Sequence, residues 1–115
     1  MRLTASAETL LADNELVDNK KHGVYLDTES SRNIVRDNHF RGNLIGAYIL
    51  GQDTAVTANV MTENGYGIRL SEPAANNRLW SNRIEHNATA GIYVTTQQRN
   101  FAGENVVADN TLNYL

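Results

Sequence analysis

Three tyrosines and one arginine recur at matching positions in this sequence and together could bind a sugar chain. Each follows a glycine by two residues, and neighbouring members lie 21 to 24 residues apart. They are Tyr25, Tyr48, Arg69 and Tyr93. Stacked on one outer face, their rings would pack on the C–H faces of sugars, and the guanidinium would bind a carboxylate in bidentate geometry. The alternative is a cation–π ladder that only shields one face of a sheet.

Acidic side chains follow these residues, and paired carboxylates could act as general acid and base or bind calcium. They are Asp27, Glu29, Asp53 and Glu72. In later copies, however, the position of Asp27 is occupied by Leu50, Ser71 and Thr95, so no column of carboxylates forms. We interpret these acids as solvated corner residues, and we predict that this chain alone is not catalytic.

The histidines give no metal-binding pattern. His22, His39 and His86 occupy three different positions of the repeat, and the spacing of a two-histidine metal site is missing. Because the chain has no cysteine, it has neither a thiolate metal site nor a disulfide. We therefore predict no metal ion and no other cofactor.

The spacing of the candidate residues follows from a repeat of asparagines along the whole chain. In its clearest copy, Asn77, Asn82 and Asn87 lie five residues apart, with Leu79 and Ile84 between them. The central asparagine recurs as Asn14, Asn38, Asn59, Asn82 and Asn105, and the one five residues later as Asn19, Asn43, Asn64, Asn87 and Asn110. The copies are 21 to 24 residues apart, which is the repeat length of a solenoid coil.

A period of five suits a three-residue strand followed by a sharp corner, with identical positions stacked about 4.8 Å apart. Side-chain amides of neighbouring coils can then bond to one another, as in cross-β amide ladders. We expect the asparagines to take the left-handed conformation that corners need, and the glycines of the third strand to supply the same freedom. The predicted inward columns are Leu11, Val35, Val56, Leu79 and Ala102, and Leu16, Phe40, Met61, Ile84 and Val107.

This repeat resembles the right-handed parallel β-helix proteins of the pectin-lyase-like superfamily, over about residues 9–115. That group includes polysaccharide lyases and hydrolases, alginate epimerases, phage tailspikes and periplasmic substrate-binding proteins. The resemblance implies an all-β fold, a single-stranded right-handed parallel β-helix. Neither terminus of this sequence supplies an obvious cap, so we expect both ends to be uncapped. We predict about five coils, starting near residues 9, 33, 54, 77 and 100, after a polar lead-in at residues 1–8. The Asp-Pro-His signature of the epimerases is absent.

Composition and chain ends bear on the partners. A net charge of −3 gives no reason to expect nucleic acid, and no apolar run is long enough to span a membrane. We expect the fifth coil to stop at Leu115 before a third strand, leaving apolar side chains and strand edges uncovered. The sequence therefore predicts either a fragment of a longer protein or a homo-oligomer that covers one end, through residues 113–115.

Three functional hypotheses remain. The first is a carbohydrate-associated repeat module that binds an extended polysaccharide on the outer face carrying Tyr25, Tyr48, Arg69 and Tyr93. The second is a structural or assembly module that self-associates through an open end. The third, implied by the superfamily resemblance, is a fragment of a polysaccharide lyase or epimerase.

Overall fold

The computed structural model of the protein describes residues 1–115, which form sixteen short strands and no helix. No helix is therefore available to span a membrane. The strands are β1 (Arg2–Leu3), β2 (Leu10–Ala12), β3 (Glu15–Val17), β4 (His22–Leu26), β5 (Ile34–Arg36), β6 (His39–Arg41), β7 (Ile45–Ile49), β8 (Ala55–Thr57), β9 (Val60–Thr62), β10 (Tyr66–Leu70), β11 (Arg78–Trp80), β12 (Arg83–Glu85), β13 (Ala90–Val94), β14 (Phe101–Gly103), β15 (Val106–Ala108) and β16 (Leu112–Tyr114).

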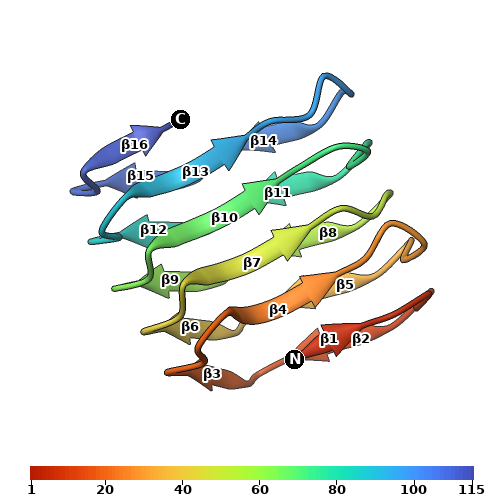
Figure 1. Cartoon of the computed structure of the whole chain (residues 1–115), viewed down its shortest axis with the longest axis horizontal. Coiled ribbons are helices and arrows are strands. Elements are labelled where there is room, and N and C mark those ends of the chain that lie inside the picture. Colours follow the sequence, from red (N-terminus) through yellow and green to blue (C-terminus); the bar gives the residue numbers. More distant parts are fainter.

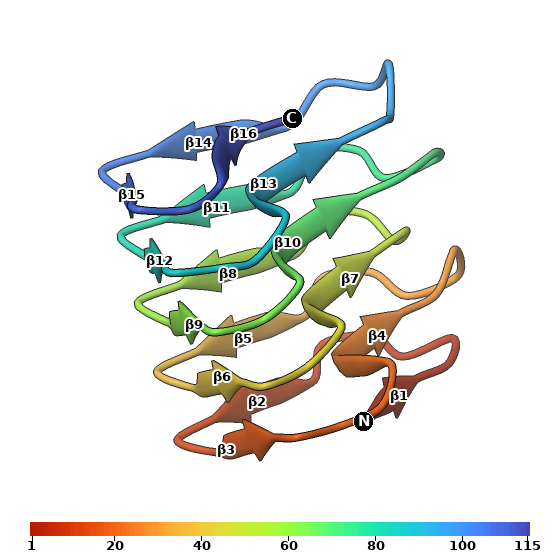
Figure 2. The same ribbon diagram turned by 60° about the vertical axis from the view of Figure 1, so that its left-hand side comes forward.

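The strands form three parallel sheets that wrap around one core, and the coils stack along a single axis (Figures 1 and 2). Sheet 1 has the order β1-β4-β7-β10-β13-β16, sheet 2 the order β14-β11-β8-β5-β2, and sheet 3 the order β15-β12-β9-β6-β3. Each strand pairs with the equivalent strand of the next coil. The predicted parallel β-helix of about five coils is confirmed, and the arrangement is consistent with the right-handed winding expected of parallel crossovers.

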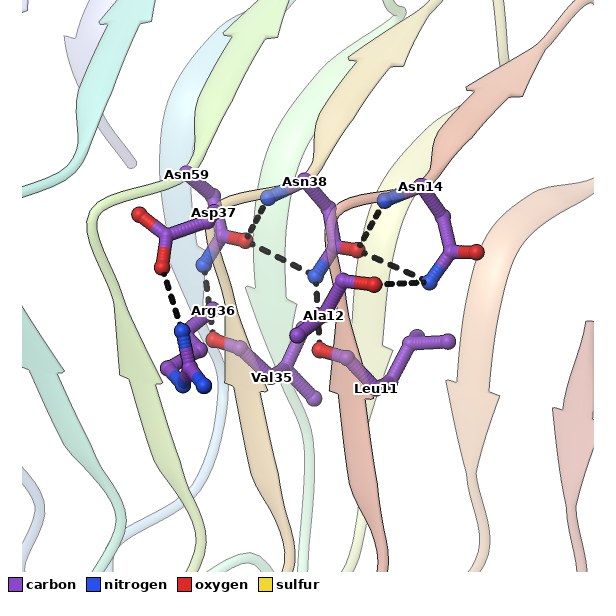
Figure 3. A network of polar contacts seen from close by, with 8 residues as sticks. All are labelled: Leu11, Ala12, Asn14, Val35, Arg36, Asp37, Asn38 and Asn59. Atoms are coloured by element: carbon purple, nitrogen blue, oxygen red, sulfur yellow. Dashed lines mark hydrogen bonds and ion pairs between the residues drawn. The ribbon is translucent and has the colours of Figure 1, made fainter.

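Asparagine carboxamides join the coils at their corners, as Figure 3 shows for the first three coils. The main-chain N–H and the Nδ2–H of Asn38 donate to Oδ1 of Asn59, at 3.0 and 3.1 Å. The Nδ2 group of Asn38 also donates to the carbonyl oxygen of Leu11 in the preceding coil, at 2.9 Å. One carboxamide therefore bridges three successive coils. The ladder residues that are at most 3% exposed are Asn33, Asn38, Asn43, Asn59, Asn64, Asn77, Asn82 and Asn87.

The left-handed residue at these corners is the one before the ladder asparagine. Asp37, Ala58 and Ser81 have φ values of 56°, 55° and 57°, and each precedes a member of the central ladder. The expectation that the asparagines themselves adopt this conformation is wrong. Because the preceding residue makes the turn, the asparagine needs no left-handed backbone, and its Oδ1 reaches the main-chain N–H of the equivalent asparagine in the preceding coil.

The expectation that the glycines of the long strands supply left-handed conformations is also wrong. These glycines allow the backbones of successive coils to pack closely. Among all the glycines, only Gly42 has a positive φ, at 72°. A Cβ on Gly46 would lie 2.5 Å from the carbonyl oxygen of Gly67, and one on Gly67 would lie 2.6 Å from that of Gly91. Glycine is needed here because the backbones of successive coils approach too closely for any side chain.

The core is a continuous apolar column inside the three sheets. Phe40, Met61 and Ile84 come from neighbouring strands of sheet 3 and are fully buried. The predicted inward columns are confirmed along the body of the helix, while Ala102 on the last coil is exposed and Val107 packs against the edge of the core.

Two details at the ends differ from the sequence expectation. Strand β16 pairs with β13, so the fifth coil has the third strand that we expected to be missing. Asn113 in this strand accepts bonds from the main-chain N–H and the Nδ2–H of Asn110, at 3.3 and 3.2 Å, in the way a further coil would. Residues 1–8 include β1, which pairs with β4, and Leu3, which packs against the core.

Replacing Asn82 with alanine should destabilise the protein. Asn82 accepts bonds from the main-chain N–H and the Nδ2–H of Asn59, both at 3.0 Å, and donates to the carbonyl oxygen of Val56 at 2.8 Å. Because each buried group left unpaired costs about 1–3 kcal/mol, we expect the free energy of unfolding to fall by at least that amount. Equilibrium unfolding in urea measures it.

The matched control is Gln97→Ala, because Gln97 is exposed and its side chain lies outside the ladder. We expect its free energy of unfolding to stay within about 0.5 kcal/mol of the wild type. Equal losses in Asn82→Ala and Gln97→Ala would show that the ladder does not hold the coils together.

Candidate functional site

The register of sheet 1 stacks the four predicted binding residues in one column. Tyr25 pairs with Tyr48, Tyr48 with Arg69, and Arg69 with Tyr93, so that β4, β7, β10 and β13 each contribute one. All four are partly exposed. Because strands in a sheet lie about 4.8 Å apart, the column extends roughly 14 Å along the axis.

Two arginines lie against the tyrosine rings of this column. The guanidinium carbon of Arg69 lies 5.1 Å from the ring centroid of Tyr48 and 4.9 Å from that of Tyr93. Arg2 in β1 adds a further cation, 5.2 Å from the centroid of Tyr25. Tyr25 and Tyr48 pack edge to face with ring centroids 5.4 Å apart, so the cation–π contacts of Arg2 and those of Arg69 are joined into one continuous row.

A second outward row lies beside the first and was missed from the sequence. His22 packs against Tyr25 and Tyr48, with ring centroids 5.3 and 5.2 Å apart, and Tyr66 stacks on Tyr93 at 5.4 Å. Ile45, the equivalent residue of β7, is buried and lies outside the central core cluster.

The missed row could have been found from the residue that precedes each glycine of the long strands. Strict alternation places His22 inward with Val24, whereas in the structure Gly23 faces the core and His22 packs outward against Tyr25. We call the combined outer surface the tyrosine face. It consists of Arg2, His22, Tyr25, Tyr48, Tyr66, Arg69 and Tyr93.

The tyrosine face is cationic. Burial lowers the pKa of His22 below its ordinary value, and the positive charges of Lys21, the Met1 amino group and Arg69 lower it further. The ion pairs of the protein lie elsewhere, between Arg32 and Glu8, Arg36 and Asp37, and Arg83 and Glu85. None of these ion pairs includes a residue of the tyrosine face, and the one carboxylate that acts on its cations is that of Asp27, near Arg2 at the first coil.

The corner acids have structural surroundings. Asp27 accepts bonds from the main-chain N–H groups of Ala5 and Glu29 and from the hydroxyl of Ser30, and these bonds, with that of Ala5 foremost, lower the pKa of its carboxyl group. Glu72 accepts a bond from the main-chain N–H of Gln97. Asp27 organises a turn, which supports the interpretation of this acid as a corner residue.

The remaining histidines lie away from the tyrosine face. His39 contacts the hydroxyl of Thr62 at 3.2 Å, and His86 is an exposed corner residue with φ of 58°. An open hollow of about 570 Å³ lies at the corner between sheets 2 and 3, where Asp13, Glu15 and His39 are among its lining residues. No three His, Asp or Glu side chains anywhere in the chain are grouped closely enough to hold a metal ion.

The stacked parallel coils, the amide ladder and the single apolar column define a β-helix repeat protein of the pectin-lyase-like kind. A model of the family described as "Periplasmic copper-binding protein (NosD)" matches residues 1–114. The chain therefore belongs to the NosD family. No curated protein and no solved structure is similar enough to count as a match.

Acidification should weaken the fold partly through His22. Its pKa is lower in the folded protein than in the unfolded chain, so between these two values the unfolded chain binds more protons. The stability contribution is complete above the unfolded pKa of about 6.5 and is lost as the pH falls from there toward the folded pKa. Urea unfolding at about pH 7.5 and about pH 5.5 should show a smaller loss for His22→Gln than for the wild type. Equal losses would contradict this assignment.

Proposed function

We propose that this chain is a carbohydrate-associated β-helix module that binds an extended polysaccharide along the tyrosine face. The observation that carries the proposal is the uninterrupted column of Tyr25, Tyr48, Arg69 and Tyr93, one residue per coil, on the outside of sheet 1. A regular row of partly exposed rings along the axis matches a ligand that is itself a linear repeat. Sugars place apolar C–H faces on such rings and direct their hydroxyl groups to the polar surroundings.

The second row strengthens this proposal because it widens the surface. Tyr66 stacks beside Tyr93, and His22 packs beside Tyr25 and Tyr48, so the face is two side chains wide over much of its length. The contacts among the rings also hold them in place before a ligand arrives, which lowers the entropy lost on binding.

The description of the matched family raises the question of copper, and the side chains of this chain do not fit a copper site. Copper sites are built from histidine, cysteine and methionine ligands, and this chain has no cysteine. Met61 is fully buried in the core, and His22 is surrounded by the positive charges of Lys21, Arg69 and the chain's amino group, which disfavour a bound cation. We therefore assign copper no part in the proposed function.

A glycan array tests the carbohydrate proposal. We expect the wild type to retain one or more linear glycans, and Tyr48→Ala and Tyr93→Ala each to weaken retention by about tenfold or more, because each removes a stacking ring. Trp80→Ala is the matched control, since Trp80 is a partly exposed aromatic residue of β11 in sheet 2, outside the tyrosine face. Retention that survives both face substitutions, or no retention of any glycan, would overturn the proposal.

We propose, as a second function, that the chain self-associates through its C-terminal end. A hollow of about 310 Å³ opens there, lined by the core residues Leu70, Leu79 and Ile92 together with the outer residues Phe101 and Tyr114. Phe101 and Tyr114 are 41% and 66% exposed. A second copy that covers this hollow would remove apolar surface from water.

Sedimentation of the protein over a range of concentrations tests self-association. We expect the mass to rise with concentration, and Phe101→Ser to shift the association to concentrations about tenfold higher or more. Leu44→Ser is the matched control, because Leu44 is 53% exposed but lies at a corner remote from the hollow. A monomer at all concentrations, or equal effects of the two substitutions, would rule this function out.

A further inference from the structure

Arg69 has an unmet hydrogen-bonding requirement at the centre of the tyrosine face. Its Nε is the one buried side-chain nitrogen or oxygen in the protein without a hydrogen-bond partner. A buried donor without an acceptor is unfavourable by about 1–3 kcal/mol, and folded proteins rarely leave one unpaired. The two Nη groups are not among the buried atoms, so the end of the guanidinium remains in contact with solvent.

The surroundings of Arg69 supply flat apolar walls and no counter-charge. The rings of Tyr48 and Tyr93 lie on either side, at 5.1 and 4.9 Å from the guanidinium carbon. None of the ion pairs of the protein involves Arg69. Because the two Nη groups are not buried, the end of the guanidinium that carries them can donate to the two oxygens of a carboxylate or a sulfate.

The positive charge is concentrated locally in a protein whose net charge is −3. Arg69, Lys21 and the amino group of Met1 all lower the pKa of His22, and Arg2 in β1 lies over the ring of Tyr25. The amino group of Met1 donates to the carbonyl oxygen of Gly23 at 2.8 Å, which holds this charge at the edge of the face. A ligand that carries repeated negative charges would meet several of these groups at once.

We propose that the tyrosine face selects an anionic polysaccharide, with a carboxylate or sulfate group bound by Arg69 and the adjoining sugar rings on Tyr48 and Tyr93. This inference rests on the carbohydrate-binding function proposed above and adds the chemical class of the ligand. The anionic group accepts hydrogen bonds from the guanidinium, and its charge offsets that of the cationic face. A neutral glycan offers the same ring contacts without these charge-assisted bonds.

Three polymers with one backbone test the proposal: hydroxyethyl cellulose, which is neutral, carboxymethyl cellulose and cellulose sulfate. Binding of the full chain is measured by affinity electrophoresis at low and high salt. We expect the two anionic polymers to bind about tenfold more tightly than the neutral one, and the difference to shrink as salt rises. Tighter binding of the carboxymethyl polymer identifies a carboxylate as the preferred group, and equal binding of the two identifies negative charge itself.

Variants of Arg69 separate its role from that of the overall charge. We expect Arg69→Gln to lose about tenfold in affinity for the anionic polymers and to keep the affinity for the neutral one. Arg69→Lys should recover only part of the loss, because lysine keeps the charge but not the planar donor edge. Arg83→Gln is the matched control, since it removes the same charge from an exposed, ion-paired residue of sheet 3. Urea unfolding confirms that each variant is folded.

Equal binding of neutral and anionic polymers by the wild type, unchanged in Arg69→Gln, would overturn this inference and leave the carbohydrate-binding function standing. A similar loss of affinity for the anionic polymers in Arg69→Gln and Arg83→Gln would also overturn the inference, because net charge alone would then explain the binding. If none of these polymers binds and the glycan array is also silent, the proposed function fails as well.

Discussion

The hydrogen bonds between corner carboxamides of successive coils are the interaction on which the rest of this structure depends. Strands of three residues make few main-chain bonds, and at each corner the chain turns away from its neighbours. Oδ1 of Asn59 supplies the acceptor that the main-chain N–H of Asn38 would otherwise lack, and Nδ2 of Asn59 bonds the carbonyl oxygen of Val35. Since these groups are buried, breaking one of these hydrogen bonds leaves a polar group without a partner and costs its full desolvation free energy. Short strands can therefore stack in one register along the whole helix.

The same stacking requirement shapes the outer surface. Backbones of successive coils approach closely at Gly46 and Gly67, where a Cβ would meet the carbonyl oxygen of the next coil. The equivalent Gly23 faces the core, the preceding residue, His22, packs outward against Tyr25, and Tyr66 takes the matching place beside Tyr93. The strands that close the core therefore also carry both rows of the tyrosine face.

The family and the functional site answer different questions about this protein. Membership of the NosD family agrees with the fold, whose repeat residues form the core and the asparagine ladders. A fold of this kind serves many functions, so function has to be argued from the side chains that the coils leave free. Those side chains are aromatic and cationic on sheet 1.

The amino-acid sequence by itself determined the coil number, the asparagine ladders, the inward columns and the stacking of Tyr25, Tyr48, Arg69 and Tyr93, because a period near 23 residues places equivalent residues side by side in any parallel solenoid. It did not reveal that Asp37 and not Asn38 makes the left-handed turn. Nor did it reveal that the glycines are needed because the backbones of successive coils approach too closely for a Cβ. It also missed the ring contact between His22 and Tyr48 and the Nε of Arg69, which has no hydrogen-bond partner. These features depend on distances between side chains and backbones of neighbouring coils, which only the packed tertiary structure decides.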